Sequence, residues 1–120
     1  MSVGLEARAD SVAAEALALR IYAMARQPDL AERALADEPL ALALVSRGSN
    51  REALRGLVLN NIGTVHLARQ ETERARRYFR DALALRESAL GREDREVGYT
   101  LMNLSVVTDP GPERVALLTR

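Results

Sequence analysis

The side chains best suited to chemistry in this sequence are one histidine and two pairs of neighbouring acids. His66 is the only histidine, and its imidazole has the pKa range of a general base or a neutral metal ligand. The sequence offers no cysteine or second histidine to share a metal, and no carboxylate within one helical turn of His66. The acid pairs Asp37–Glu38 and Glu93–Asp94 lie beside helix-breaking residues, where solvated carboxylates are expected. We therefore interpret His66 as a packing residue between helices, and we expect a protein that is not an enzyme, with no catalytic residue, metal or cofactor.

The composition excludes several further classes of function. The chain has 120 residues, no cysteine, and 17 basic residues balanced by 17 acidic ones. All the basic residues are arginines, which excludes a Schiff-base lysine and the lysine of a phosphate-binding loop. A formal net charge of zero gives no overall field that would attract nucleic acid or an anionic membrane.

The sequence also shows no membrane or secretory segment. Its longest stretch without a charge runs from Gly56 to Ala68, whereas a membrane-spanning helix needs about 20 apolar residues. Charged residues near the N-terminus interrupt any apolar core of a signal peptide. Because cysteine is absent as well, we expect a cytoplasmic protein without a membrane partner.

Helix-forming residues dominate, since alanine and leucine together account for 39 of the 120 residues. Breakers at Pro28-Asp29, 48–50, 70–72, 91–94 and 109–112 divide the chain into segments of helical length. Within these segments apolar residues recur every three or four positions, and no strand-like alternation is present. The sequence predicts a single all-α domain, with a kink or break near Glu38 caused by Pro39.

A short motif occurs twice, at positions 42 residues apart. Residues 59–63 (LNNIG) align with residues 101–105 (LMNLS), and a predicted helix lies between them. One repeat therefore consists of a helix, a short turn, a second helix and a polar loop. Helix pairs of this kind cannot bury both faces alone, so they stack into a solenoid.

Residues 57 to about 107 resemble the tetratricopeptide repeat family. The pattern is carried by Leu59, Ile62, Gly63 and His66 in one helix and by Ala75, Phe79 and Ala82 in the next. The alanine- and leucine-rich run 82–91 is similar to the kinesin light chain subtype with its 42-residue repeat, although Gln70 replaces the usual turn glycine. The resemblance implies a right-handed α-α superhelix of antiparallel helix pairs. We expect a degenerate or capping repeat over 1–48, a repeat over 49–91 and a partial repeat over 92–120.

In the resembling family, the first helix of each pair lines a concave groove. An asparagine at the positions of Asn61 and Asn103 commonly hydrogen-bonds a bound peptide there, because a carboxamide both donates and accepts. The alternative is a structural hydrogen bond between neighbouring helices. The predicted peptide-binding residues are Asn60, Asn61, Thr64, Tyr99 and Asn103, with Leu57, Ala68, Met102 and Val106 on the same surface. The lysines with which this family clamps a terminal carboxylate have no counterpart here.

An arginine-rich stretch forms a candidate basic patch. Its members are Arg69, Arg76, Arg77 and Arg80, together with Arg74. A solvated outer helix face is the simpler interpretation, and nucleic-acid binding is the less favoured alternative. The few residues that follow Gly111 suggest a second alternative, a regulatory domain that forms homo-oligomers through an incomplete C-terminal end. The main prediction is a non-catalytic module that binds a protein or peptide partner, as a scaffold or sensor in a larger regulatory system.

Overall fold

The computed structural model describes residues 3–46 and 52–119, and they form helices joined by short loops. The helices are α1 (Val3–Ala25), the 3-10 helix η1 (Pro28–Leu30), α2 (Ala31–Ser46), α3 (Glu52–Ala68), α4 (Thr72–Leu90), α5 (Arg95–Val106) and α6 (Pro112–Leu118). These two ranges contain no strand. The all-α prediction is therefore confirmed for the described part of the chain.

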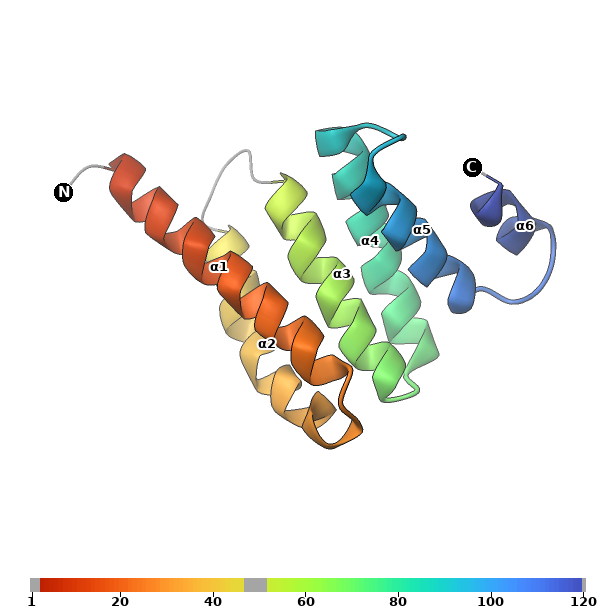
Figure 1. Cartoon of the computed structure of the whole chain (residues 1–120), viewed down its shortest axis with the longest axis horizontal. Helices are drawn as coiled ribbons and strands as arrows, with labels where there is room; N and C mark the ends of the chain where they lie inside the picture. The colour runs from red at the N-terminus through yellow and green to blue at the C-terminus, as the bar shows by residue number, and fades with distance from the viewer. Residues whose placement is uncertain (1–2, 47–51, 120) are drawn as a thin grey trace.

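The helices form a row two layers deep, with α1, α3 and α5 in front of α2 and α4 in the view of Figure 1, and successive helices run in opposite directions. Helix α3 lies near the middle of the row and contacts α1, α2 and α4. The row is long and thin, with principal extents of 53 × 35 × 18 Å. This arrangement agrees with stacked antiparallel helix pairs, whereas the right-handed superhelix stays a prediction.

The predicted breaks coincide with the observed helix ends. Pro28 begins η1, and the loops at 69–71, 91–94 and 107–111 separate the later helices. Gln70 has a φ of 63° and Gly91 a φ of 89°, so both turns use the left-handed backbone region. Asp94 caps α5, because its carboxylate accepts a 2.8 Å hydrogen bond from the main-chain N–H of Glu96. The break predicted at 48–50 lies outside the described residues.

Of the kink or break predicted near Glu38, the break does not occur, and the kink stays a prediction. Helix α2 continues from Ala31 to Ser46 with Pro39 inside it. A proline removes one main-chain hydrogen bond and crowds the preceding turn. The helix tolerates this because Ala34, Ala41 and Val45 are buried on both sides of the proline and anchor the two halves to the same core.

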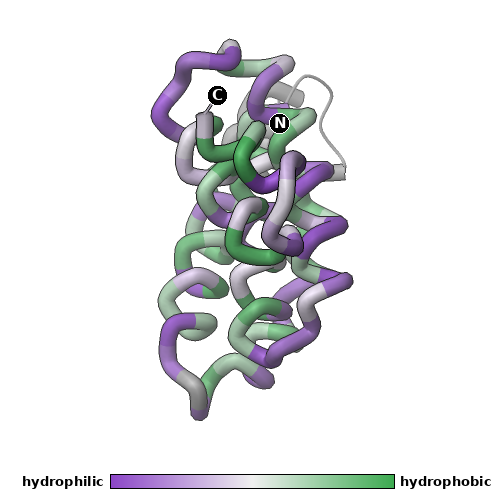
Figure 2. The backbone as a smooth tube through the Cα atoms, turned by 90° about the vertical axis from the view of Figure 1, so that its right-hand side faces the viewer, coloured by the Kyte–Doolittle hydropathy of each residue, from purple (hydrophilic) through white to green (hydrophobic). Residues whose placement is uncertain are grey.

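Two apolar clusters hold the row together. The first joins α1, α2 and α3, and the second joins α4 and α5 around Phe79, which is completely buried. Gly63 of α3 lets Phe79 approach closely, since a Cβ at Gly63 would lie 2.7 Å from the phenyl ring. Hydrophobic and hydrophilic stretches alternate along the helices in Figure 2, as expected for helices with one buried side.

Candidate functional site

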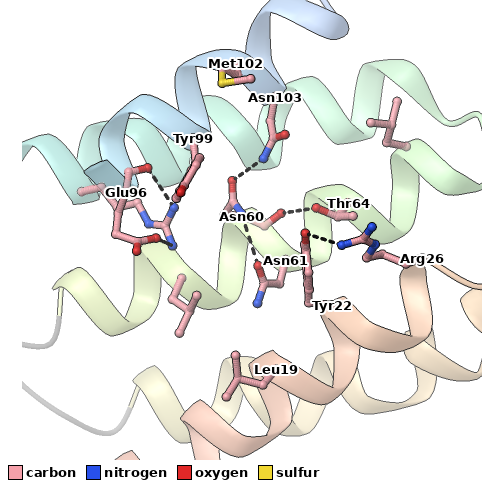
Figure 3. Close-up of a pocket in the computed structure, with 13 residues that line it drawn as sticks. Leu19, Tyr22, Arg26, Asn60, Asn61, Thr64, Glu96, Tyr99, Met102 and Asn103 are labelled. Carbon is pink, nitrogen blue, oxygen red and sulfur yellow. Dashed lines mark hydrogen bonds and ion pairs between the residues drawn. The ribbon is translucent and has the colours of Figure 1, made fainter. Parts of the chain in front are cut away.

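A groove of about 410 Å³ crosses α1, α3 and α5, the first helix of each pair (Figure 3). Its two walls are apolar and come from the outer helices, with Leu19 and Tyr22 in α1 and Tyr99 and Met102 in α5. These four side chains expose between 39% and 60% of their surface. An exposed apolar surface of this kind is typical of interaction sites.

The floor of the groove is polar and comes from α3. Asn60 and Asn61 are only 6% and 3% exposed, and both are hydrogen-bonded within the protein. Asn61 Nδ2 donates to the main-chain oxygen of Ala18 in α1 at 2.8 Å. Asn103 Nδ2 of α5 donates to Asn60 Oδ1 at 3.0 Å. Both bonds join residues 43 positions apart, so the recurring asparagines connect each first helix to the one before it.

A buried arginine supports one end of the floor from the opposite layer. Arg86 belongs to α4, yet its Nη1 donates to Thr100 Oγ1 at 2.8 Å and to the main-chain oxygen of Glu96 at 3.1 Å. Burial lowers the pKa of Arg86, and the nearby Glu96 carboxylate, 3.5 Å from Nη2, opposes this effect. Gly56 of α3 leaves room for the Arg86 side chain, because a Cβ at Gly56 would lie 2.7 Å from Arg86 Cγ.

The structure brings the five predicted groove residues together. Asn60, Asn61, Thr64, Tyr99 and Asn103 all line the groove. Leu57 and Met102 also line it, whereas Ala68 lies beside a different pocket and Val106 is exposed outside the groove lining. Whether these residues bind a peptide stays a prediction.

Helix α1 also contributes to the groove, which was not predicted from the sequence. Leu19, Tyr22 and Arg26 form the wall facing α5, and Arg86 and Glu96 complete the lining. Residue types alone gave one usable signal for α1, since Leu19 and Tyr22 are large apolar residues three positions apart on one helix face.

One of three comparisons with known proteins gives a match. Residues 57–96, which span most of α3, all of α4 and the start of α5, match the family model described as Tetratricopeptide repeat. The match covers 40 of the 120 residues and shows that this segment is similar to a tetratricopeptide repeat. No curated protein and no solved structure matches the chain. Tetratricopeptide repeats generally mediate protein–protein interactions, and they are interaction modules rather than catalysts. In the described part of the chain, no helix is long and apolar enough to cross a membrane.

The arginines of the candidate basic patch largely contact acids and main-chain oxygens. Arg69 Nε donates to Glu71 at 2.7 Å, Arg76 Nε donates to the main-chain oxygen of Val107 at 2.9 Å, and Arg80 Nη2 donates to Glu113 at 3.0 Å. Arg77 lies elsewhere, at a pocket beside His66. The structure therefore distributes these side chains over several contacts, and nucleic-acid binding stays a prediction without support from them.

His66 has a more polar environment than its sequence neighbours indicate. Its ring stacks on Tyr78 of the repeat at a centroid distance of 5.1 Å, which supports its interpretation as a packing residue. The imidazole also lies between two carboxylates, with Nδ1 3.2 Å from Glu71 Oε1 and Nε2 3.1 Å from Glu38 Oε1.

The two acids differ in their titration. Burial raises the pKa of Glu38, although His66 partly opposes this shift. Hydrogen bonds from Arg69 and His66 lower the pKa of Glu71. The described residues hold no group of three histidine or acidic side chains placed for a metal ion.

Proposed function

We propose that this chain binds a peptide or protein segment in the groove formed by α1, α3 and α5. The observation that carries the proposal is the pair of exposed apolar walls, Leu19 with Tyr22 and Tyr99 with Met102, facing each other across a polar floor. Large aromatic and thioether side chains are enriched in the centres of protein interfaces. The repeat match over residues 57–96 includes most of α3 and supports an interaction role for the helix that forms the groove floor.

The groove residues divide into two roles under this proposal. The walls supply apolar contact area, and the aromatic rings do so at low conformational cost. Asn60 and Asn61 hold the helices in position, because their amides already bond to each other and to Ala18. Among the described residues, Asn103 is hydrogen-bonded only through Nδ2, so its Oδ1 is the groove acceptor for a ligand N–H. Thr64 also lines the groove, and its hydroxyl, which donates to the main-chain oxygen of Asn60, can accept a further hydrogen bond from the ligand.

The finer assignments belong to the same proposal. The helix pairs continue as a right-handed superhelix with the 42-residue repeat of the kinesin light chain subtype. Its units are a degenerate or capping repeat over 1–48, a repeat over 49–91 and a partial repeat over 92–120. The module serves as a non-catalytic scaffold or sensor within a larger cytoplasmic regulatory system.

The groove can be tested with peptides selected from a random display library on the wild-type chain. The affinity of a selected peptide is measured by fluorescence anisotropy against Tyr22→Ala and Tyr99→Ala. Each substitution is expected to weaken binding about tenfold or more, the effect of losing a central aromatic contact. Leu90→Ala is the matched control, because Leu90 is exposed to the same 39% as Tyr22 but lies on α4 outside the groove. Peptides that bind both tyrosine variants as tightly as the wild type would show that the groove is not the binding site.

A further inference from the structure

The first helix is apolar on two opposite sides. Its inner side carries Ala14, Ala18, Ile21 and Ala25, which are buried against α2 and α3. Its outer side carries Val12, Ala16, Leu19 and Ala23, which are all exposed and follow a 4-3-4 spacing. At 100° per residue the second set lies about half a turn away from the first. We call the second set the outer stripe of α1.

The opposite end of the row also exposes apolar side chains. Met102 of α5 and Leu118 of α6 are 60% and 61% exposed. Figure 2 faces this end of the molecule, and hydrophobic stretches of the chain are visible on its nearest helices. We call Met102 and Leu118 the C-terminal face.

The outer stripe corresponds in register to a face that α3 buries. Moving forward by the 42 positions that separate the two sequence motifs takes Ala16 to Val58, Leu19 to Asn61, and Ala23 to Val65. Val58 and Val65 are fully buried and Asn61 nearly so, because α3 packs through this side onto the α1–α2 pair. The outer stripe therefore occupies the positions of a helix-packing face and lies exposed.

The C-terminal face occupies the positions that receive such a helix. Asn61 contacts Ala18, and Asn103 contacts Asn60. Extending this series of contacts by another 42 residues makes Met102 the residue that is contacted, as Ala18 and Asn60 are. The residue that contacts it would belong to a following unit, at the position equivalent to Leu19, as Asn61 and Asn103 are. Leu19 and Met102 are both apolar, whereas the equivalent pairs inside the chain, Asn61 with Ala18 and Asn103 with Asn60, are hydrogen-bonded.

A second interior contact extends in the same way. Arg76 Nε donates to the main-chain oxygen of Val107 at 2.9 Å, which joins α4 to the end of α5. Leu118 lies 42 residues after Arg76 and is its equivalent in the next repeat. Ala23 lies two 42-residue repeats before Val107 and is its equivalent in α1. If one unit followed another with the same 42-residue register, two apolar pairs would therefore form between them. These pairs are Leu19 with Met102 and Ala23 with Leu118.

From this match we propose that copies of the chain stack head to tail, with the outer stripe of α1 of one copy on the C-terminal face of the next. A second copy is the occupant because both halves of the contact lie on the same chain and fit one register. The contact joins different surfaces of the two copies, so it is open-ended and the assembly grows with concentration. Leu19 and Met102 also line the groove, so a second copy and a bound peptide compete for these two side chains.

Two blocking variants test the proposal by sedimentation velocity over a range of concentrations. Ala16→Glu blocks the outer stripe and Leu118→Glu blocks the C-terminal face, since each would bury an unpaired charge at the contact. Both sites are exposed and neither lines the groove, so the fold and the groove are expected to stay intact, as far-UV circular dichroism would show. The mass of the wild type is expected to rise with concentration, whereas each variant alone stays monomeric.

An equimolar mixture of the two variants gives the decisive result. The Ala16→Glu copy keeps its C-terminal face and the Leu118→Glu copy keeps its outer stripe, so the mixture is expected to form one-to-one pairs and nothing larger. Leu90→Glu, on the exposed end of α4, is the control and should associate like the wild type. A monomeric wild type, a mixture without pairs, or dimers of Leu118→Glu alone, which would indicate symmetric pairing through α1, would each overturn the proposal.

Discussion

The side-chain amide of Asn61 in α3 donates a 2.8 Å hydrogen bond to the main-chain carbonyl of Ala18 in α1. Both residues are almost completely buried at this helix–helix junction. The same carboxamide accepts a 3.2 Å hydrogen bond from Asn60 Nδ2. An amide is suited to this place because it donates to a main-chain oxygen while accepting from a neighbouring side chain. Packing between helices therefore explains an asparagine in the middle of α3.

The first prediction concerns the stability that this bond provides. Asn61→Ala leaves the buried oxygen of Ala18 and the amide of Asn60 without a partner, so we expect a loss of about 1–3 kcal/mol in the free energy of unfolding. Asn103→Ala, at a half-buried site on α5, should cost less, about 1 kcal/mol or below. Urea denaturation followed by circular dichroism measures both values. Equal losses for the two variants would contradict the assignment of Asn61 to a structural contact.

Local signals predicted the helices well, and non-local contacts explain what was missed. Pro28, Gly91 and Pro112 act through their own backbone, so their effect on helix ends is visible in the sequence. Pro39 failed as a breaker because packing on both sides of it, which depends on other helices, holds α2 together.

Only part of the candidate site was predicted, because the rest depends on contacts between helices that are far apart in the sequence. The spacing of Asn61 and Asn103 fits a peptide-binding role and a structural role equally, and only their partners in neighbouring helices distinguish the two. Tyr22 was missed because α1 lacks the motif that marks α3 and α5. Glu38 reaches His66 from a different helix, 28 positions earlier in the chain, so no local spacing could indicate the contact.

The second prediction concerns the turn between α3 and α4. Gln70 adopts a φ of 63°, a region in which a side chain costs about 1–2 kcal/mol per residue and glycine costs little. Gln70→Gly should therefore stabilise the protein by about 0.5–1 kcal/mol after allowing for the greater freedom of glycine in the unfolded chain. The expected observation is a Tm several degrees higher in thermal denaturation. Gln70→Ala is the control, since alanine keeps the Cβ; a similar rise in its Tm would show that backbone strain is not the cause.

The third prediction compares two glycines within helices. Gly63→Ala places a Cβ 2.7 Å from the ring of Phe79, so overpacking should cost about 1–3 kcal/mol. Gly98→Ala introduces a Cβ with no atom within 4 Å and should stabilise α5 by up to about 1 kcal/mol. Chemical denaturation of the two variants gives the comparison. A Gly63→Ala variant as stable as the wild type would mean that Phe79 can move aside without loss.

The fourth prediction concerns the two acids on either side of His66, whose effects on stability should have opposite pH dependence. Burial raises the pKa of Glu38, so its contribution to stability is complete below its usual pKa of 4.5 and is lost as the pH rises through the folded-state value. Glu71 has a lowered pKa, because Arg69 and His66 hydrogen-bond its carboxylate. Its contribution is present above 4.5 and is lost as the pH falls through the folded-state value.

Two amide variants separate these effects. Relative to the wild type, Glu38→Gln should become progressively more stable as the pH rises from 4 to 7, because it removes a carboxyl group that is costly to ionise where it lies. Glu71→Gln should be least stable relative to the wild type near pH 7, and its deficit should shrink in acid. Urea denaturation of all three proteins at several pH values between 3 and 7 measures the differences. Parallel curves for the two variants would show that His66 does not lie between carboxyls of opposite titration behaviour.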